Sequence, residues 1–97
     1  GYSVTYLTPN TKNPSALNGS YISWSGSRMG NNYGHIGILQ SASFNSKTKE
    51  WTFTFLNANW YGTVVKKVSD SKCNNVVIGS QKTKNLSGMT FFTVKRK

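Results

Sequence analysis

Hydrophobic and polar residues alternate along most of the chain beyond residue 19. The clearest example is the segment 50–57, in which Trp51, Phe53 and Phe55 are separated by threonines. A period of two places these three aromatic side chains on one face of a β-strand. No long window carries the spacing of an amphipathic helix. The pattern therefore predicts an all-β protein.

Six segments fit this pattern, each rich in β-branched or aromatic residues and bounded by turn-forming residues: 21–24, 34–43, 50–57, 63–68, 75–78 and 89–96. A polar turn at 45–49 joins the second and third segments into a hairpin. Along the second segment, alternation assigns Ile36, Ile38 and Ala42 to one face and His35 and Leu39 to the other. We expect about six antiparallel strands that form a twisted sheet or a small open barrel.

Residues 1–19 lack a sustained pattern. They contain the breakers Pro9, Pro14 and the polar run 10–13. A short extended segment is indicated only by Tyr2, Val4, Tyr6 and Leu7. We therefore expect one small domain, 1–97, with an irregular N-terminal segment, 1–19, followed by the antiparallel sheet, 20–97. Because the chain opens at Gly1 and not at Met, we interpret it as a processed or truncated product.

The charge balance narrows the kinds of partner. Twelve Lys and Arg residues against two acidic residues give a net charge of +10. Such a field favours anionic partners, such as nucleic acid, an anionic cell wall or an acidic protein. With Glu50 and Asp70 as the only carboxylate side chains, a paired-carboxylate glycosidase is improbable. A single cysteine, Cys73, allows no internal disulfide and no ordinary four-ligand zinc site, and no apolar stretch is long enough for a membrane span.

The candidate chemistry centres on His35, the only histidine. It opens a predicted strand directly after Gly34, and the next strand closes with Asn57 and Asn59. If these two strands pair as a hairpin, an asparagine comes to lie beside the imidazole and can fix its orientation and tautomer. The alternatives are a histidine satisfied by a backbone carbonyl and asparagines that serve the turn.

Two motifs carry a family resemblance. The run 33–39 (YGHIGIL), followed by a hairpin and the run 55–60 (FLNANW), resembles the C-terminal half of CHAP domains. These domains are papain-like cysteine amidases and endopeptidases that cut bacterial peptidoglycan. The segment 18–24 (NGSYISW) is similar to the strand that leads into the family's Gly-rich loop. The resemblance implies the β half of an α+β papain-like fold in a bacterial or phage protein that is secreted or cell-wall associated.

The same resemblance implies roles for individual residues. His35 corresponds to the catalytic base, and Asn57 or Asn59 to the residue that orients it. A substrate cleft is implied around Tyr33, Gly34 and Trp60. No cofactor and no metal are implied.

The chain departs from the family at the nucleophile, because no cysteine precedes His35. Cys73 lies among lysines, which favour a thiolate, but the family topology places its segment elsewhere. The hypothesis is therefore a CHAP-like fragment or degenerate relative that binds or cleaves peptidoglycan. A separate segment or a second polypeptide would supply the thiol, and without one the chain is a binder and not an enzyme.

Two hypotheses from other classes stay open. The first is a small basic nucleic-acid-binding protein or ribonuclease-like toxin, in which His35 and Glu50 would form the acid–base pair. The second is an interaction module without chemistry, whose lysines form a solvated face. Steeply salt-sensitive binding of RNA or DNA would favour the first.

Overall fold

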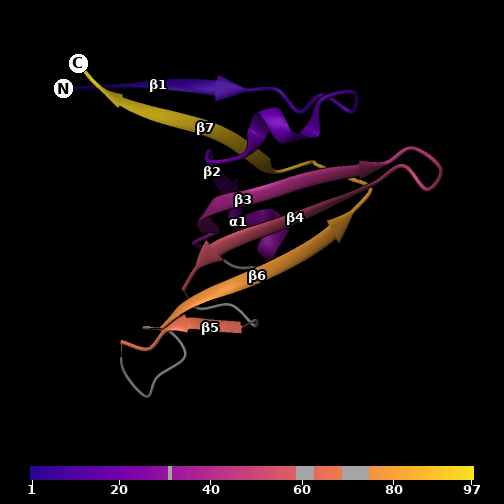
Figure 1. Ribbon diagram of the computed structural model, residues 1–97. Coiled ribbons are helices and arrows are strands. Elements are labelled where there is room, and N and C mark those ends of the chain that lie inside the picture. The colour runs from indigo at the N-terminus through magenta and orange to yellow at the C-terminus, as the bar shows by residue number, and fades with distance from the viewer. Residues whose placement is uncertain (31, 59–62, 69–74) are drawn as a thin grey trace.

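The computed structural model describes residues 1–30, 32–58, 63–68 and 75–97, which are almost entirely β-strand (Figure 1). The strands are β1 (Tyr2–Leu7), β2 (Tyr21–Trp24), β3 (His35–Asn45), β4 (Glu50–Asn57), β5 (Thr63–Lys66), β6 (Val76–Thr83) and β7 (Met89–Arg96). Two short helices precede β2 and β3, the 3-10 helix η1 (Pro14–Leu17) and the single α-helical turn α1 (Gly26–Met29).

The strands form one antiparallel sheet in the order β1-β7-β2-β3-β4-β6-β5. Strands β1 and β5 lie at opposite ends of this order, so the sheet is twisted but open (Figure 1). The antiparallel all-β sheet predicted from the alternation is confirmed. It has seven strands among the described residues in place of about six.

The additional strand lies in the segment expected to be irregular, and this expectation needs correction. Strand β1 pairs with β7 along its whole length, from Tyr2 opposite Arg96 to Leu7 opposite Phe91. The sheet thus begins at Tyr2 and not at residue 20. The alternating pattern of β1 is short, and its two tyrosines are exposed. The segment therefore lacks the buried apolar positions by which a strand is recognised in a sequence. Tyr2–Leu7 becomes a strand because it pairs with β7, which is distant in the sequence.

The core lies on one face of the sheet, as the alternation in β4 requires. Phe53 and Phe55 are fully buried, and Phe53 stacks on Trp51 with ring centroids 5.6 Å apart. Leu17 of η1 is also buried in this cluster. The core cluster comprises Leu17, Ile22, Trp24, Leu39, Ala42, Trp51, Phe53, Phe55 and Phe91. Burial of these large apolar surfaces is the main favourable contribution to folding.

A β-bulge in β3 corrects the expected division of its faces. The pairing of β3 with β4 shifts between Leu39, opposite Phe55, and Ser41, opposite Thr54. The extra residue, Gln40, brings Ala42 onto the buried face with Leu39, away from the exposed Ile36 and Ile38. The prediction that Ala42 shares a face with these two isoleucines is therefore wrong. Strict alternation cannot anticipate one unpaired residue.

The loop between β2 and β3 is hydrogen-bonded to the end of β6 and to the segment that follows it. Arg28 in α1 donates to the Ser87 carbonyl at 2.6 Å and to Thr83 Oγ1 at 3.0 Å. Ser25 caps the turn by accepting from the Arg28 backbone N–H. These bonds hold the loop that leads into His35 against the connection between β6 and β7.

Candidate functional site

The hairpin places the first residue of β3 beside the last residue of β4. Ile38 pairs with Leu56, so Asn57 follows opposite Gly37 and is a diagonal neighbour of His35, two residues before Gly37. The Nε2 atom of His35 lies 2.6 Å from the Oδ1 atom of Asn57. The structure therefore brings together two residues that the sequence singled out, at hydrogen-bond distance.

A second contact orients the amide of Asn57. Its Nδ2 atom donates to the backbone carbonyl of Val77 in β6 at 3.2 Å. Because that carbonyl can only accept, the amide nitrogen faces Val77 and the amide oxygen faces His35. The amide oxygen also only accepts, so this assignment places a proton on Nε2. In the neutral ring the lone pair is then on Nδ1.

Trp24 supports the imidazole ring. It lies opposite His35 in the pairing of β2 with β3, and the two ring centroids are 5.5 Å apart. Trp24 is itself buried, contacts Phe55 edge-on at 4.8 Å, and donates from Nε1 to Gln81 Oε1 at 2.7 Å. With its far end fixed, the indole forms a rigid wall behind His35.

Two glycines, Gly34 and Gly37, allow the backbone around His35 to lie close to β2 and β4. Gly34 has φ +73°, and a Cβ there would collide with the Trp24 carbonyl oxygen. Gly37 would place a Cβ 2.9 Å from the Leu56 carbonyl oxygen and 3.2 Å from the Cβ of Asn57. A side chain at either position would push β3 away from the strands that support His35.

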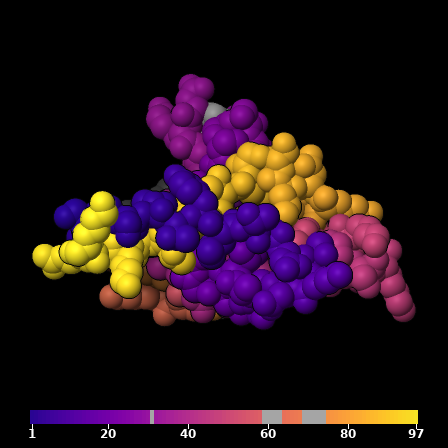
Figure 2. Space-filling view, turned by 90° about the horizontal axis from the view of Figure 1, so that it is seen from above, coloured from indigo at the N-terminus to yellow at the C-terminus, as the bar shows by residue number. Residues whose placement is uncertain are grey.

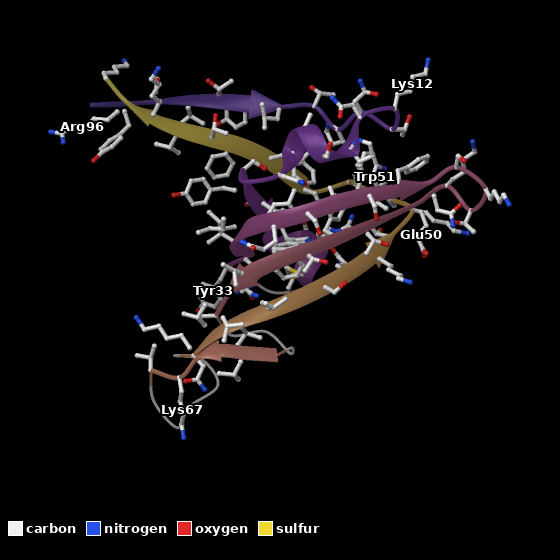
Figure 3. The ribbon with its side chains drawn as sticks, viewed as in Figure 1. Lys12, Tyr33, Glu50, Trp51, Lys67 and Arg96 are labelled. Atoms are coloured by element: carbon white, nitrogen blue, oxygen red, sulfur yellow. The ribbon has the colours of Figure 1, made fainter. Side chains whose placement is uncertain are left out.

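A shallow pocket of about 440 Å³ opens at this end of the sheet. Its lining residues are Ser23, Trp24, Tyr33, Gly34, His35, Ile36 and Ala58. Tyr33 is 94% exposed and lies at the lower left of the sheet in Figure 3. Two residues of the predicted cleft, Tyr33 and Gly34, thus line a pocket with His35.

Other predicted residues lie outside the described part of the chain, namely Asn59, Trp60 and Cys73. Four pocket residues were not predicted from the sequence: Ser23, Trp24, Ile36 and Ala58. Trp24 could have been found only from the pairing of β2 with β3, which places it opposite His35.

The proposed pairing of His35 with Glu50 is wrong. Glu50 opens β4 opposite Asn45, whereas His35 stands at the other end of the 11-residue strand β3. At ~3.3 Å per residue, this separates the two residues by about 30 Å. An acid–base pair that acts on one phosphate needs both groups within hydrogen-bond reach of the reacting atoms.

Among the described residues, the pocket lining includes no Lys, Arg, Asp or Glu. No group of three or more metal-ligating side chains occurs among the residues that the structure describes. Within the same ranges, no helix is both long and apolar enough to cross a membrane. The arrangement can therefore orient one imidazole beside a neutral ligand and exchange a proton through it.

Comparisons with known proteins add no assignment: no family model matches the chain, and no curated protein and no solved structure shows significant similarity to it.

Proposed function

We propose that this chain is the β portion of a CHAP-like cell-wall protein that holds peptidoglycan peptide against His35. The observation that carries the proposal is the hydrogen-bonded chain from His35 Nε2 through the Asn57 amide to the Val77 carbonyl. A nucleophile–base–orienter set needs a base whose tautomer is fixed by a third group. The sequence motifs 33–39 and 55–60 support the same assignment.

In the hydrolytic form of the proposal, Nδ1 of His35 takes the proton of a cysteine thiol supplied by another segment or a second polypeptide. The thiolate attacks the carbonyl carbon of a peptide bond, and the imidazolium returns the proton to the amine nitrogen as the C–N bond breaks. Water, deprotonated by His35, then cleaves the thioester and releases a carboxylate and the thiol. Asn57 keeps the ring oriented through both steps.

The described lining of the pocket favours a peptide over a nucleic-acid substrate. Phosphate chemistry calls for Lys or Arg beside the reacting group, and neither occurs among the described residues that line the pocket around His35. A neutral amide requires hydrogen bonds and apolar contact, which Ser23, Tyr33 and Ile36 offer.

Incubation with purified peptidoglycan tests the proposal through two measurements, pull-down of the protein and release of new amino groups. We expect the wild-type chain to sediment with peptidoglycan. Release that is lost in His35→Ala supports the hydrolytic form, and Cys73→Ser then tells whether the thiol belongs to this chain. Pull-down without release overturns the hydrolase assignment for this chain and leaves a binder. If peptidoglycan does not retain the protein, both forms are wrong.

A further inference from the structure

Strand β1 is one of the two edge strands of the sheet in the described part of the chain. Strand β1 stands at the end of the sheet order, and its other neighbour is β7. Figure 2 looks onto this edge and shows the N-terminal residues at the surface beside the C-terminal ones. Edge strands are commonly protected by charge or proline, yet the sequence of β1 is YSVTYL.

The ribbon formed by β1 and β7 also extends past the rest of the sheet (Figure 1). Strand β2 pairs with β7 only from Met89 to Phe92, whereas β1 pairs with it from Phe91 to Arg96. The last four residues of β7 are therefore part of a two-stranded ribbon. Two strands alone are marginally stable in water, and additional strands would stabilise them.

The backbone of β1 has a regular set of groups directed outward. The Lys97 N–H donates to the Gly1 carbonyl at 3.0 Å, and the pairing with β7 has no register shift. Hydrogen-bonded and non-hydrogen-bonded pairs alternate in an antiparallel ladder. Tyr2, Val4 and Tyr6 therefore direct their N–H and C=O groups away from β7.

The sequence of this edge reads nearly the same in both directions around Val4. Antiparallel pairing of two copies centred there places Val4 opposite Val4, Tyr2 opposite Tyr6 and Ser3 opposite Thr5. The residues with outward backbone groups then face one another, so the pairs Val4–Val4 and Tyr2–Tyr6, the latter formed twice by the two-fold symmetry, can each exchange both hydrogen bonds. Such an interface is self-complementary, as two-fold symmetry requires.

The side chains on one face match this arrangement. Tyr6 lies 6.3 Å from Phe92, and Phe92 stacks on Tyr21 at 5.3 Å, measured between ring centroids. This row of aromatic residues ends at Tyr6, which is 71% exposed. In the paired form, Tyr2 of the second copy stands next to Tyr6 and extends the row.

The positive charges do not meet in this arrangement. Strand β1 carries no charge, and the basic residues of the ribbon, Lys95, Arg96 and Lys97, lie on or after β7. With ~3.3 Å per residue and ~4.8 Å between strands, the two Lys95 Cα atoms would stand about 16 Å apart. Salt at physiological strength screens charges beyond about 8 Å.

We propose that β1 is a homodimerisation edge, at which two copies of this chain join their sheets through antiparallel β1 strands centred on Val4. This inference is independent of the proposed peptidoglycan function, because β1 is separated by β7 from β2 and β3, the strands that contribute Trp24 and His35 to the pocket.

Sedimentation equilibrium of the wild-type chain over a range of concentrations and salt measures the association. We expect a monomer–dimer equilibrium between 10.8 kDa and twice that mass. The dimer fraction should rise with salt, because each copy carries +10. A mass of one chain at every concentration and salt level would overturn the proposal.

Two variants with the same added charge test the register. Val4→Lys places two lysines opposite each other at the two-fold axis and should abolish the dimer. Thr5→Lys places its lysine opposite Ser3 and should retain the dimer. Circular dichroism of both variants verifies that they fold. Equal loss in both, or retention in both, contradicts this register.

A charge exchange completes the test. Val4→Glu should also be monomeric alone, whereas mixing it with Val4→Lys should restore association as a heterodimer, detected by native mass spectrometry. The two opposite charges then meet at the axis. If the mixture stays monomeric while the wild type dimerises, the dimer uses another surface and the proposal fails.

Discussion

At the scale of single residues, the site depends on how Asn57 fixes the imidazole of His35. The amide is held on one side by Val77 and faces Nε2 on the other, at 2.6 Å. Buried polar groups with defined partners stay oriented, because breaking the contact leaves a polar group unsatisfied. The geometry therefore predicts a single dominant tautomer of the neutral ring.

Asn57→Ala should redistribute that tautomer. In the wild type, nitrogen-15 NMR of the neutral ring should show a protonated Nε2 and an unprotonated Nδ1. Removal of the amide should give a mixture of both forms, since nothing at residue 57 then accepts from Nε2. Asn32→Ala, an exposed residue of the preceding loop, should leave the His35 signals unchanged. The same Nε2-protonated spectrum in Asn57→Ala would show that another contact fixes the ring.

Gly34 and Gly30 provide a matched pair that tests whether the close approach of the backbone at Gly34 requires glycine. Both have positive φ, +73° and +72°, but only Gly34 has a neighbouring carbonyl oxygen in the space a Cβ would fill. Gly30→Ala should cost about 1–2 kcal/mol, the usual strain of this conformation. Gly34→Ala should cost distinctly more and should shift the His35 signals. Urea unfolding measures both costs, and equal values would show that the close approach to Trp24 is unimportant.

At the scale of elements, the sequence predicted what local alternation determines. The aromatic spacing in β4 and the polar turn after β3 were enough to predict the hairpin, and the hairpin was enough to predict that Asn57 or Asn59 lies near His35. For Tyr2–Leu7 the sequence indicated only a short extended segment outside the sheet, because the partner that makes it a strand is β7, more than eighty residues away. Nor did the sequence predict Trp24 as the wall behind His35, since that contact depends on the pairing of β2 with β3.

The bulge in β3 has a testable consequence for register. Deletion of Gln40 removes the unpaired residue and leaves Leu39 and Ala42 on the buried face, so the fold should be retained. Deletion of Ser43 moves Phe44 to the exposed face and breaks its contact with Trp51, whose ring centroid lies 5.1 Å away. The latter should cost about 1.5–3 kcal/mol, the burial of one large apolar side chain.

Urea unfolding of the two deletion variants measures this difference. Deletion of Ser43 should lower the midpoint well below that of the Gln40 deletion. A larger loss from deleting Gln40 would mean that the bulge itself stabilises β3, for example by setting the curvature of the sheet.

At the scale of the whole molecule, the positive charge is distributed around the periphery. Lys12, Lys67 and Arg96 lie at three separate corners in Figure 3, and none lines the pocket of His35. A basic groove for single-stranded nucleic acid would instead combine clustered cations with stacked aromatic side chains. The charge of +10 thus creates a general attraction for anionic polymers, and these three basic residues do not form a common track.

This distribution predicts weak binding of nucleic acid with a shallow dependence on salt. Each phosphate neutralised on a single strand contributes a slope of about −0.7 in a plot of log K against log salt. A short oligonucleotide that can reach only one corner of the molecule neutralises few phosphates. Fluorescence anisotropy with a short single-stranded RNA should therefore show a small slope and no binding near physiological salt. A steep slope with tight binding at that salt would require several clustered cations, and the nucleic-acid hypothesis would then replace the cell-wall proposal.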